Sequence, residues 1–197
     1  MSYVVGIDPQ ITLLAVRIDY RDKAGGWQKV AWFQVLMKRK DAYVIVAEWE
    51  KYMVEQCIRT VDEIEGLIET HHGSDKGYHV EFGVEQQRGR VKSIPEACLI
   101  TAAKAKGPIW NIHVPHPSSW KKAISFYKKE TLEDKKKGHV TGNKDNKKRA
   151  EELYGKELRD FCMDKKIPTP KIIHHLCDAA CIARYLQSLS IEDKTKE

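Results

Sequence analysis

The stretch YVVGIDPQITLLAVRIDY, residues 3–20, decides the fold class, because it contains two apolar segments of strand length in close succession. The first segment, residues 3–8, ends in Asp8, and the second covers residues 11–20. A turn-forming segment with two glycines follows, and residues 27–37 are again rich in β-branched and aromatic side chains. The pattern predicts a meander of three antiparallel strands.

The rest of the chain alternates between helical and strand patterns. Asp41 is a candidate N-cap for a long helix, and Ser93 with Glu96 matches a capping box in front of a second helix, which Gly107 and Pro108 end. The elements expected after the meander are, in order, a helix to about residue 68, a strand over 78–85, a helix over 94–106, a strand over 109–114, a short helix through Trp120, and helices over about 146–161 and 173–189.

This order predicts one α/β domain over residues 1–190, built on a mixed five-stranded sheet with flanking helices. The three antiparallel strands come first, and the later strands are joined to them by helical crossovers, which predicts parallel pairing. Residues 127–146 are rich in lysine and poor in apolar side chains, so we expect a mobile basic segment there. We expect residues 191–197 to be a frayed tail.

Positive charge is concentrated in one part of the chain. The formal net charge is +6 with a pI of about 8.9, and residues 121–149 alone contain eleven Lys or Arg and four acids. A local basic block of this kind favours a polyanionic partner, although a solvated loop has the same composition.

Other features exclude several classes of protein. The apolar stretches have strand length, too short to span a bilayer, and the N-terminal sequence resembles neither a secretory signal nor a transit peptide. The five cysteines are odd in number and scattered, which argues against a disulfide framework and for a reducing compartment. We therefore expect an intracellular protein without a membrane partner, in the cytoplasm, the nucleus or a viral factory.

Three acids lie in apolar surroundings at distant points of the chain. Asp8 ends the first strand, Glu85 ends the fourth, and Asp178 lies in the last helix one turn after His175. An acid on such a face is costly to bury without a partner. If the first and fourth strands are neighbours, Asp8 and Glu85 meet at one edge of the sheet, and the last helix need only cross that edge.

Such a set of carboxylates suits phosphodiester hydrolysis. Carboxylate oxygens are the ligands that Mg²⁺ prefers, and two divalent ions can stabilise both the attacking and the leaving oxygen of an in-line displacement. We expect Asp8 to be central enough to bridge two ions. Strand-terminal acids are often only solvated, but three from distant segments are harder to explain in that way.

Four segments resemble the RuvC family of Holliday-junction resolvases. They are VVGIDP (4–9) for the first strand and its Asp, GVEQ (83–86) for the second acidic motif, the helix 94–106 for a small-residue helix at the dimer interface, and HHLCDAACIARY (174–185) for the closing motif. The resemblance covers nearly the whole chain in order. It implies an RNase H-like fold, a structure-selective DNA endonuclease for four-way junctions, and a homodimer.

By position, the resemblance implies that Asp8, Glu85, His175 and Asp178 form the catalytic metal site, with two Mg²⁺ or Mn²⁺ ions. His175 departs from the family pattern, which usually has an acid there. A neutral imidazole can bind a metal or accept a proton from water, whereas a protonated one does neither. We regard His174 as a candidate partner for its neighbour.

The chain is also similar to the poxvirus and mitochondrial resolvases, in residues 85–90, which loosely resemble their Glu-x-Gln-x-Arg segment, and in a Lys-Lys-Arg helix at residues 147–149. This similarity implies phosphate contacts from Lys121 and from Lys147 or Lys148, and arginines that enter the junction. The candidate DNA-binding residues are Arg88, Arg90, Lys92, Lys121, Lys122, Lys147 and Lys148.

Two other functions compete with a resolvase. One is a monomeric RNase H-like nuclease for RNA–DNA hybrids or flaps, and the other is a non-catalytic nucleic-acid-binding module. The alanine-rich helix and the basic block favour a dimeric resolvase, and the presence of all three carboxylates argues against a non-catalytic module.

Overall fold

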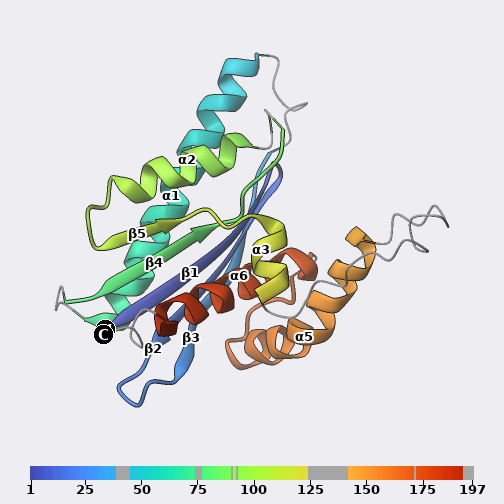
Figure 1. Cartoon of the computed structure of the whole chain (residues 1–197). Helices are drawn as coiled ribbons and strands as arrows, with labels where there is room; N and C mark the ends of the chain where they lie inside the picture. Colours follow the sequence, from blue (N-terminus) through green and yellow to red (C-terminus); the bar gives the residue numbers. More distant parts are fainter. Residues whose placement is uncertain are drawn as a thin grey trace.

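A five-stranded mixed sheet forms the centre of the molecule (Figure 1). The structure, a computed structural model, describes residues 1–38, 45–73, 77–89, 91, 93–123, 142–170 and 172–192. The strand order is β3-β2-β1-β4-β5, with β1 (Ser2–Gln10), β2 (Leu13–Arg21), β3 (Trp27–Leu36), β4 (His79–Val84) and β5 (Trp110–His113). β1, β2 and β3 are antiparallel neighbours, whereas β4 and β5 run parallel to β1. The predicted α/β class and mixed sheet are confirmed.

Helices cover both faces of this sheet (Figure 1). The described helices are α1 (Val46–His72), α2 (Ser93–Lys104), α3 (Pro117–Ala123), α5 (Gly142–Asp164) and α6 (Ile173–Glu192). α1 and α2 pack on one face, and α6 packs on the other together with α3 and α5. Within the described residues, none of these helices is long and apolar enough to cross a membrane.

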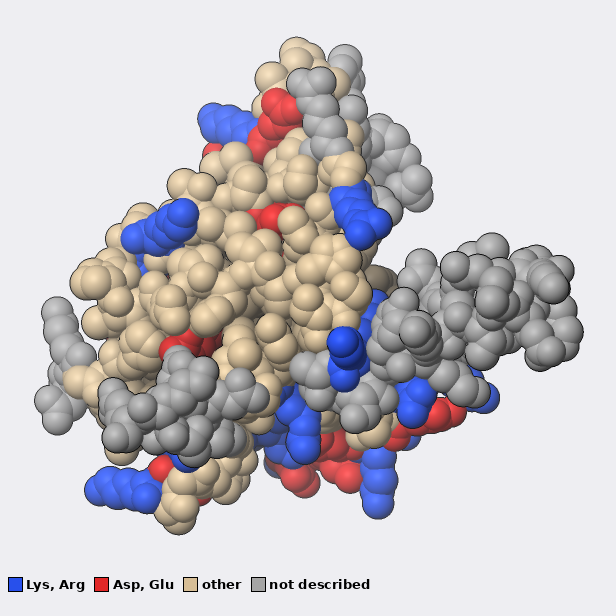
Figure 2. All heavy atoms as spheres, in the orientation of Figure 1, with Lys and Arg blue, Asp and Glu red and all other residues tan. Residues whose placement is uncertain are grey.

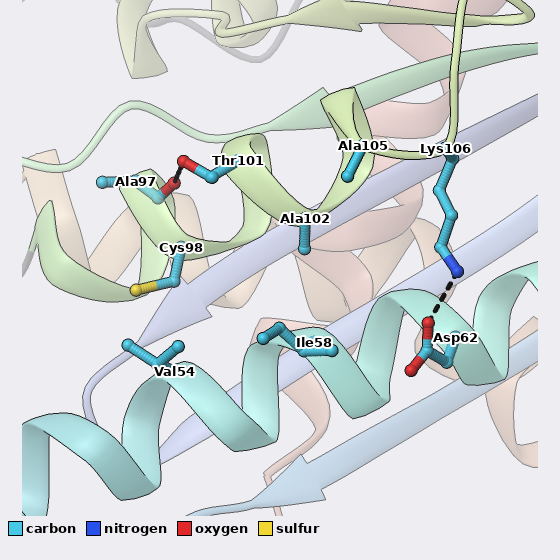
Figure 3. Close-up of a pocket in the computed structure, with 9 residues that line it drawn as sticks. All are labelled: Val54, Ile58, Asp62, Ala97, Cys98, Thr101, Ala102, Ala105 and Lys106. Carbon is cyan, nitrogen blue, oxygen red and sulfur yellow. Dashed lines mark hydrogen bonds and ion pairs between the residues drawn. The ribbon is translucent and has the colours of Figure 1, made fainter.

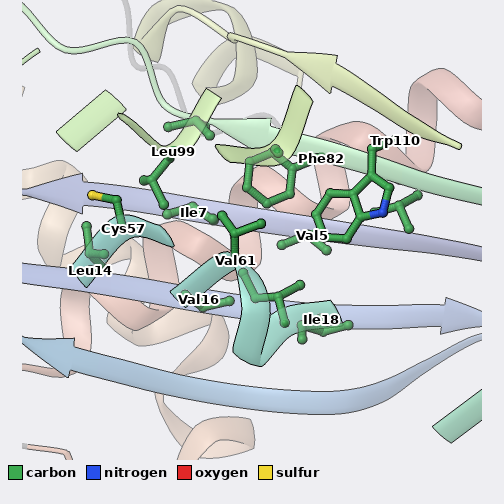
Figure 4. Close-up of a cluster of buried hydrophobic side chains, with 14 of the residues drawn as sticks. Val5, Ile7, Leu14, Val16, Ile18, Cys57, Val61, Phe82, Leu99 and Trp110 are labelled. Atoms are coloured by element: carbon green, nitrogen blue, oxygen red, sulfur yellow. The ribbon is translucent and has the colours of Figure 1, made fainter. Parts of the chain in front are cut away.

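Strand alternation decides which β1 side chains face which layer. Val5 and Ile7 point into the core beneath α1, where they meet Val61 of that helix and Phe82 of β4 (Figure 4). Asp8, one position further along the strand, belongs to the opposite face, the one that α6 covers. The apolar run of β1 thus places an acid under a helix.

Two glycines allow α6 to lie directly on the sheet. A Cβ atom on Gly6 would lie 2.2 Å from the carbonyl oxygen of Ala179 and 2.5 Å from the backbone nitrogen of Ala183. Gly83 is the β4 partner of Gly6 in the register, and there a Cβ would lie 2.7 Å from Cδ1 of Leu186. The small residues on both surfaces permit this close approach, which brings the start of α6 to the end of β1.

Several boundaries differ from the sequence-based expectation. α1 begins at Val46 with Ile45 as its N-cap and no side-chain capping bond, while Asp41 lies outside the described residues. α5 begins at Gly142, within the segment expected to be mobile, and the part of that segment before residue 142 is outside the described residues. α6 continues to Glu192, and residues 193–197 are likewise outside the described part.

Candidate active site

Asp8 lies at the end of β1 and is almost completely buried, with 1% of its surface exposed. Its Oδ2 atom is 2.5 Å from Nδ1 of His175, and its Oδ1 atom accepts a hydrogen bond from Nε2 of Gln10 at 2.8 Å. Because Gln10 is two residues further along the same strand, it emerges on the same face as Asp8. Both carboxylate oxygens therefore have a partner that fixes their orientation.

His175 and Asp178 lie one turn apart on α6, as expected from their spacing. Their ligand atoms and an oxygen of Asp8 all lie within 4.8 Å of one another. Two carboxylates and an imidazole at such distances can hold a divalent metal ion. The close packing of α6 on Gly6 explains why these three residues meet.

Glu85 completes the group from the neighbouring strand. It directly follows β4, and its backbone N–H donates to the carbonyl oxygen of Ile7 at 3.0 Å, which extends the pairing of β4 with β1 by one step. Its carboxyl group is in hydrogen-bonding contact with Asp8. Asp8 thus contacts both Glu85 and His175, and the group whose ligand atoms lie within 4.8 Å of one another contains Asp8, His175 and Asp178.

Two further donors fix the carboxylate of Glu85. Nε1 of the fully buried Trp120 donates to Oε1 at 3.1 Å, and Nε2 of Gln87 donates to Oε2 at 3.0 Å. Glu96 of α2 accepts the backbone N–H of Gln87 at 2.7 Å, so the capping-box glutamate ties the loop after β4 to α2. This loop is therefore held at both its backbone and its side chains.

The electrostatics of Glu85 fit a cation-binding site. Burial and the nearby charge of Asp8 raise the pKa of Glu85 to about 8, although Lys121 and the hydrogen bond from Trp120 act in the opposite direction. Two carboxyl groups forced together in a buried place disfavour the doubly ionised state. A divalent cation would relieve that repulsion, so the donor set fits the metal that the sequence predicts.

Sequence reasoning did not identify Gln10, Gln87 and Trp120 as parts of this site. The two glutamines follow Asp8 and Glu85 at a spacing of two residues, which is a usable signal, because alternation gives such residues a common face. Trp120 carries no comparable signal. Its contact depends on how α3 packs against the end of the sheet.

The candidate DNA-binding residues surround the site only in part. Nζ of Lys121 lies 4.8 Å from the ring centre of Trp120, beside Glu85, and Lys122 is exposed on the same short helix. Figure 2 shows basic side chains gathered around the side of the molecule where α3 and α5 lie. Arg88 is exposed, and its Nη2 atom is 2.8 Å from Nε2 of His116.

Of the remaining candidate DNA-binding residues, only Lys148 has a described side chain. Lys148 is exposed on α5, with Nζ 3.8 Å from Oε1 of Glu152. Arg90, Lys92 and the side chain of Lys147 lie outside the described residues. The role of this basic set in DNA binding stays a prediction.

His174 lies next to the site, beside His175 at the start of α6. Its ring centre is 4.1 Å from that of His175, and its Nδ1 atom is 3.9 Å from Oε1 of Glu151 on α5. His174 therefore links the start of α6 to α5.

Comparison with known proteins identifies the fold. No protein-family sequence model matches the chain, and neither does the sequence of any curated protein. The Thermus thermophilus RuvC structure matches with a TM-score of 0.54 at 16% identity, covering 96% of both chains. RuvC from that organism in complex with a Holliday junction substrate matches with a TM-score of 0.53 at 14% identity, again covering 96% of both chains.

A third solved structure, the yeast mitochondrial Holliday junction resolvase Ydc2, matches with a TM-score of 0.53 at 14% identity. The alignment covers 93% of this chain and 78% of Ydc2. At such low identities, the likeness establishes the fold. The predicted resemblance to the RuvC type and the RNase H-like fold that it implies are thereby confirmed.

Proposed function

We propose that this chain is a metal-dependent DNA endonuclease that resolves four-way junctions by paired nicks in opposing strands. The observation that carries the proposal is the setting of Asp8, which contacts His175 and Glu85 and lies within 4.8 Å of a ligand atom of Asp178. The fold supports the proposal, because its solved neighbours are named as RuvC and as a Holliday junction resolvase, one of them with its junction substrate.

In this proposal, Asp8, Glu85, His175 and Asp178 hold two Mg²⁺ or Mn²⁺ ions, with Asp8 shared between them. When bound, these ions supply charge stabilisation for the attacking and leaving oxygens of phosphodiester hydrolysis. The imidazole of His175 favours Mn²⁺ over Mg²⁺ relative to an all-carboxylate site, so Mn²⁺ is expected to support at least equal activity.

The protein's own task is to hold these ligands and to exclude water from them. Gln10 orients Asp8, and Trp120 with Gln87 orients Glu85, through the hydrogen bonds described above. Their donor groups hold the two carboxylates in fixed orientations at the ends of β1 and β4. Preorganisation of this kind raises metal affinity and positions the reacting phosphate.

The basic side chains near the site provide phosphate contacts in the proposed complex. Lys121 is the closest of them to the carboxylates, since its charge acts directly on Glu85. Lys122, Lys148 and Arg88 are exposed and can bind further phosphates. Such contacts position the duplex arms and carry no sequence information of their own.

Two nicks in one junction require two active sites, and we propose that a second copy of the chain supplies the other. The surface that we assign to it is the α1–α2 groove, lined by Val54, Ile58, Asp62, Ala97, Cys98, Thr101, Ala102, Ala105 and Lys106 (Figure 3). Val54 and Ile58 are 40% and 45% exposed on its rim. Apolar side chains so exposed next to alanines suit burial by a partner.

Sedimentation velocity tests this assignment. Ile58→Glu and Ala102→Arg should convert a dimer to a monomer at micromolar concentration. Met163→Glu, at a 75% exposed apolar position of α5, is the matched control and should leave the dimer intact. A wild-type chain that sediments as a monomer at all concentrations, with and without junction DNA, would contradict the homodimer.

The central experiment is cleavage of a labelled four-way junction in Mg²⁺ and in Mn²⁺, with duplex, flap and RNA–DNA hybrid controls. We expect symmetric nicks in the junction, little cleavage of the duplex, and none by Asp8→Asn or Asp178→Asn, which should still bind the junction. Preferred cleavage of the hybrid or the flap would favour the monomeric nuclease. Junction binding without cleavage in any divalent metal would favour the non-catalytic module.

A further inference from the structure

Two thiols face one another between α1 and α2. Cys57 of α1 is fully buried, and its Sγ atom lies 3.8 Å from the carbonyl oxygen of Pro95 in the first turn of α2. Cys98 follows Pro95 by three residues, so both lie on the same side of α2. The two thiols are in hydrogen-bonding contact, and Figure 3 shows the sulfur of Cys98 pointing from α2 toward α1.

The pair is open to small molecules from one side only. Cys98 is partly exposed and lines the α1–α2 groove, whose volume is about 500 Å³, whereas Cys57 lies beneath it. Val54 and Ile58, which precede and follow Cys57 on α1, form the opposite wall. A small uncharged reagent can enter such an apolar groove and meets Cys98 first.

We propose that Cys57 and Cys98 form a reversible oxidation site, in which a hydroperoxide that enters the α1–α2 groove converts the facing thiols to a disulfide between α1 and α2. This site is separate from the carboxylate site and does not depend on DNA cleavage. Because the proposed homodimer would cover the same groove, we expect the oxidation in the monomeric chain.

The reaction balances with the hydroperoxide as the oxidant. The thiolate of Cys98 attacks the O–O bond, so that an S–O bond forms, the O–O bond breaks, and the alcohol leaves with a proton. The sulfur of Cys57 then attacks that of Cys98; the S–S bond forms, the S–O bond breaks, and water leaves with the proton of Cys57. The two thiols lose two electrons and two protons, and the hydroperoxide is reduced to an alcohol and water.

We assign the attacking role to Cys98 because it lines the groove while Cys57 lies beneath it, and the local electrostatics agree. The hydrogen bond from Cys57 lowers the pKa of the Cys98 thiol to about 7, in spite of partial burial. The same hydrogen bond and full burial raise the pKa of Cys57, so it stays protonated until Cys98 has been oxidised. A thiolate next to a second thiol is the usual arrangement of a redox-active pair.

The chain contains a matched control pair. Cys177 and Cys181 are one helical turn apart on α6, and both are fully buried in the core beneath it. Burial raises the pKa of each of these thiols. They therefore have neither the access of the first pair nor a stabilised thiolate, and we expect them to stay reduced.

The test treats the full chain with a small excess of hydrogen peroxide and maps disulfides on non-reduced peptides by mass spectrometry. We expect a Cys57–Cys98 cross-link as the dominant product, reversed by dithiothreitol. Cys57→Ser should instead accumulate a dimedone-trapped sulfenic acid at Cys98, and Cys98→Ser should form neither product. A Cys177→Ser/Cys181→Ser double variant should oxidise at the wild-type rate.

A second measurement on the unmodified protein guards against variants that fail to fold. Phenylarsine oxide bridges two neighbouring thiols, so one equivalent per chain should bind and should protect Cys98 from iodoacetamide. Cys98 should react with iodoacetamide at least about tenfold faster than Cys177, following the exposure and pKa of the two thiols. Absence of the cross-link with Cys98 unreacted, or a Cys177–Cys181 disulfide formed at an equal rate, would overturn the proposal.

The proposed homodimer and the oxidation site can be separated in the same experiment. If a second copy covers the α1–α2 groove, the labelling of Cys98 slows as protein concentration rises through the dimerisation range. If the groove is free in solution, labelling is independent of concentration, and the cross-link still forms. None of these readouts measures DNA cleavage, so failure of the proposed nuclease function leaves them unaffected.

Discussion

The imidazole of His175 lies against the carboxylate of Asp8, with Nδ1 2.5 Å from Oδ2, although 167 positions separate the two residues in the sequence. The contact exists because α6 packs directly on the backbone of β1 at Gly6. One turn later on the same helix face, Asp178 is brought to the same place. The position of one helix thus determines whether the candidate site is complete.

Replacement of His175 tests its role as a ligand. His175→Ala should reduce junction cleavage by at least about 100-fold, the upper range for loss of groups that only support a ligand. His175→Asp should keep substantial activity. The pH below which its cleavage rate falls should be lower than in the wild type, because a carboxylate loses its proton at lower pH than an imidazole. The measurement is a pH–rate profile at saturating Mn²⁺. His174→Ala is the neighbouring control and should keep the wild-type profile; an unchanged profile in His175→Ala would make His175 a packing residue.

The raised pKa of Glu85 predicts a pH-dependent stability of the metal-free protein. The pKa is about 8 in the folded chain against an ordinary value of 4.5, so between these values the folded state holds a proton that the unfolded state has lost. Stability should therefore fall as pH rises through this window. Glu85→Gln removes this proton linkage, and its melting temperature in EDTA should fall less between about pH 5 and pH 8 than that of the wild type.

The control for this prediction is Glu63→Gln, at an exposed position of α1, which should keep the wild-type dependence. Addition of Mg²⁺ should stabilise the wild type more at pH 8 than at pH 5, because metal binding must displace the proton of Glu85. If the melting temperatures of the wild type and of Glu85→Gln changed equally with pH, the carboxyl group of Glu85 would ionise normally in the folded chain.

The sheet and the carboxylates could be predicted because their signals are local. The apolar run before Asp8, the glycine-containing turn after the second strand and the apolar segment before Glu85 each indicate a strand from adjacent residues alone. The small residues around Asp178 indicate a helix that packs closely. From strand order alone, both acids were expected at one sheet edge, and the structure has them in contact.

Features that depend on tertiary packing could not be predicted in this way. Trp120 resembles any core tryptophan in the sequence, and only the packing of α3 brings its indole N–H to Glu85. Cys57 and Cys98 each occupy an apolar helix position, and their meeting follows from how α1 and α2 lie together. The start of α1 also differs from the expectation, because the helix begins at Val46 with Ile45 as its N-cap, whereas the sequence offered a capping residue at Asp41.

The two glycines under α6 give a matched pair of substitutions. Gly6→Ala would place its Cβ 2.2 Å from the carbonyl oxygen of Ala179, a backbone atom that cannot move without shifting α6. We expect a loss of about 3 kcal/mol or more of unfolding free energy, and a loss of cleavage even where the variant is folded. Gly83→Ala meets side-chain atoms of Leu186 and Ile182 and no backbone atom among its nearest neighbours, so it should cost about 1 kcal/mol with activity retained. Urea unfolding measures the loss of stability in each variant, and junction cleavage measures the loss of activity. Equal losses in Gly6→Ala and Gly83→Ala would contradict the close packing of α6 on the backbone of Gly6.

Salt dependence of junction binding tests the basic residues. Each phosphate contact should contribute about 0.9 to the slope of log affinity against log salt, so Lys121→Ala and Lys148→Ala should each make that slope shallower by about this amount. The measurement uses the Asp8→Asn protein, which should bind without cutting. Lys23→Ala, in the turn between β2 and β3 at the far end of β1 from Asp8, is the control. Unchanged slopes in both test variants would assign the phosphate contacts to other residues.

Two tryptophans separate a positioning role from simple packing. Trp120→Phe removes the donor to Glu85, whereas Trp110→Phe removes an Nε1 that is buried without a partner among the described residues. Both changes shrink a buried ring, but only Trp120→Phe also removes a hydrogen bond, so it should cost more stability than Trp110→Phe. Trp120→Phe alone should lower kcat by about 10-fold or more and leave junction binding unchanged, as loss of a ligand's supporting hydrogen bond does. This hydrogen bond lowers the pKa of Glu85. Its loss should therefore also move the increase of the cleavage rate with pH to higher pH values. If Trp110→Phe impaired cleavage as much and moved the pH profile equally, Trp120 would matter only as core volume.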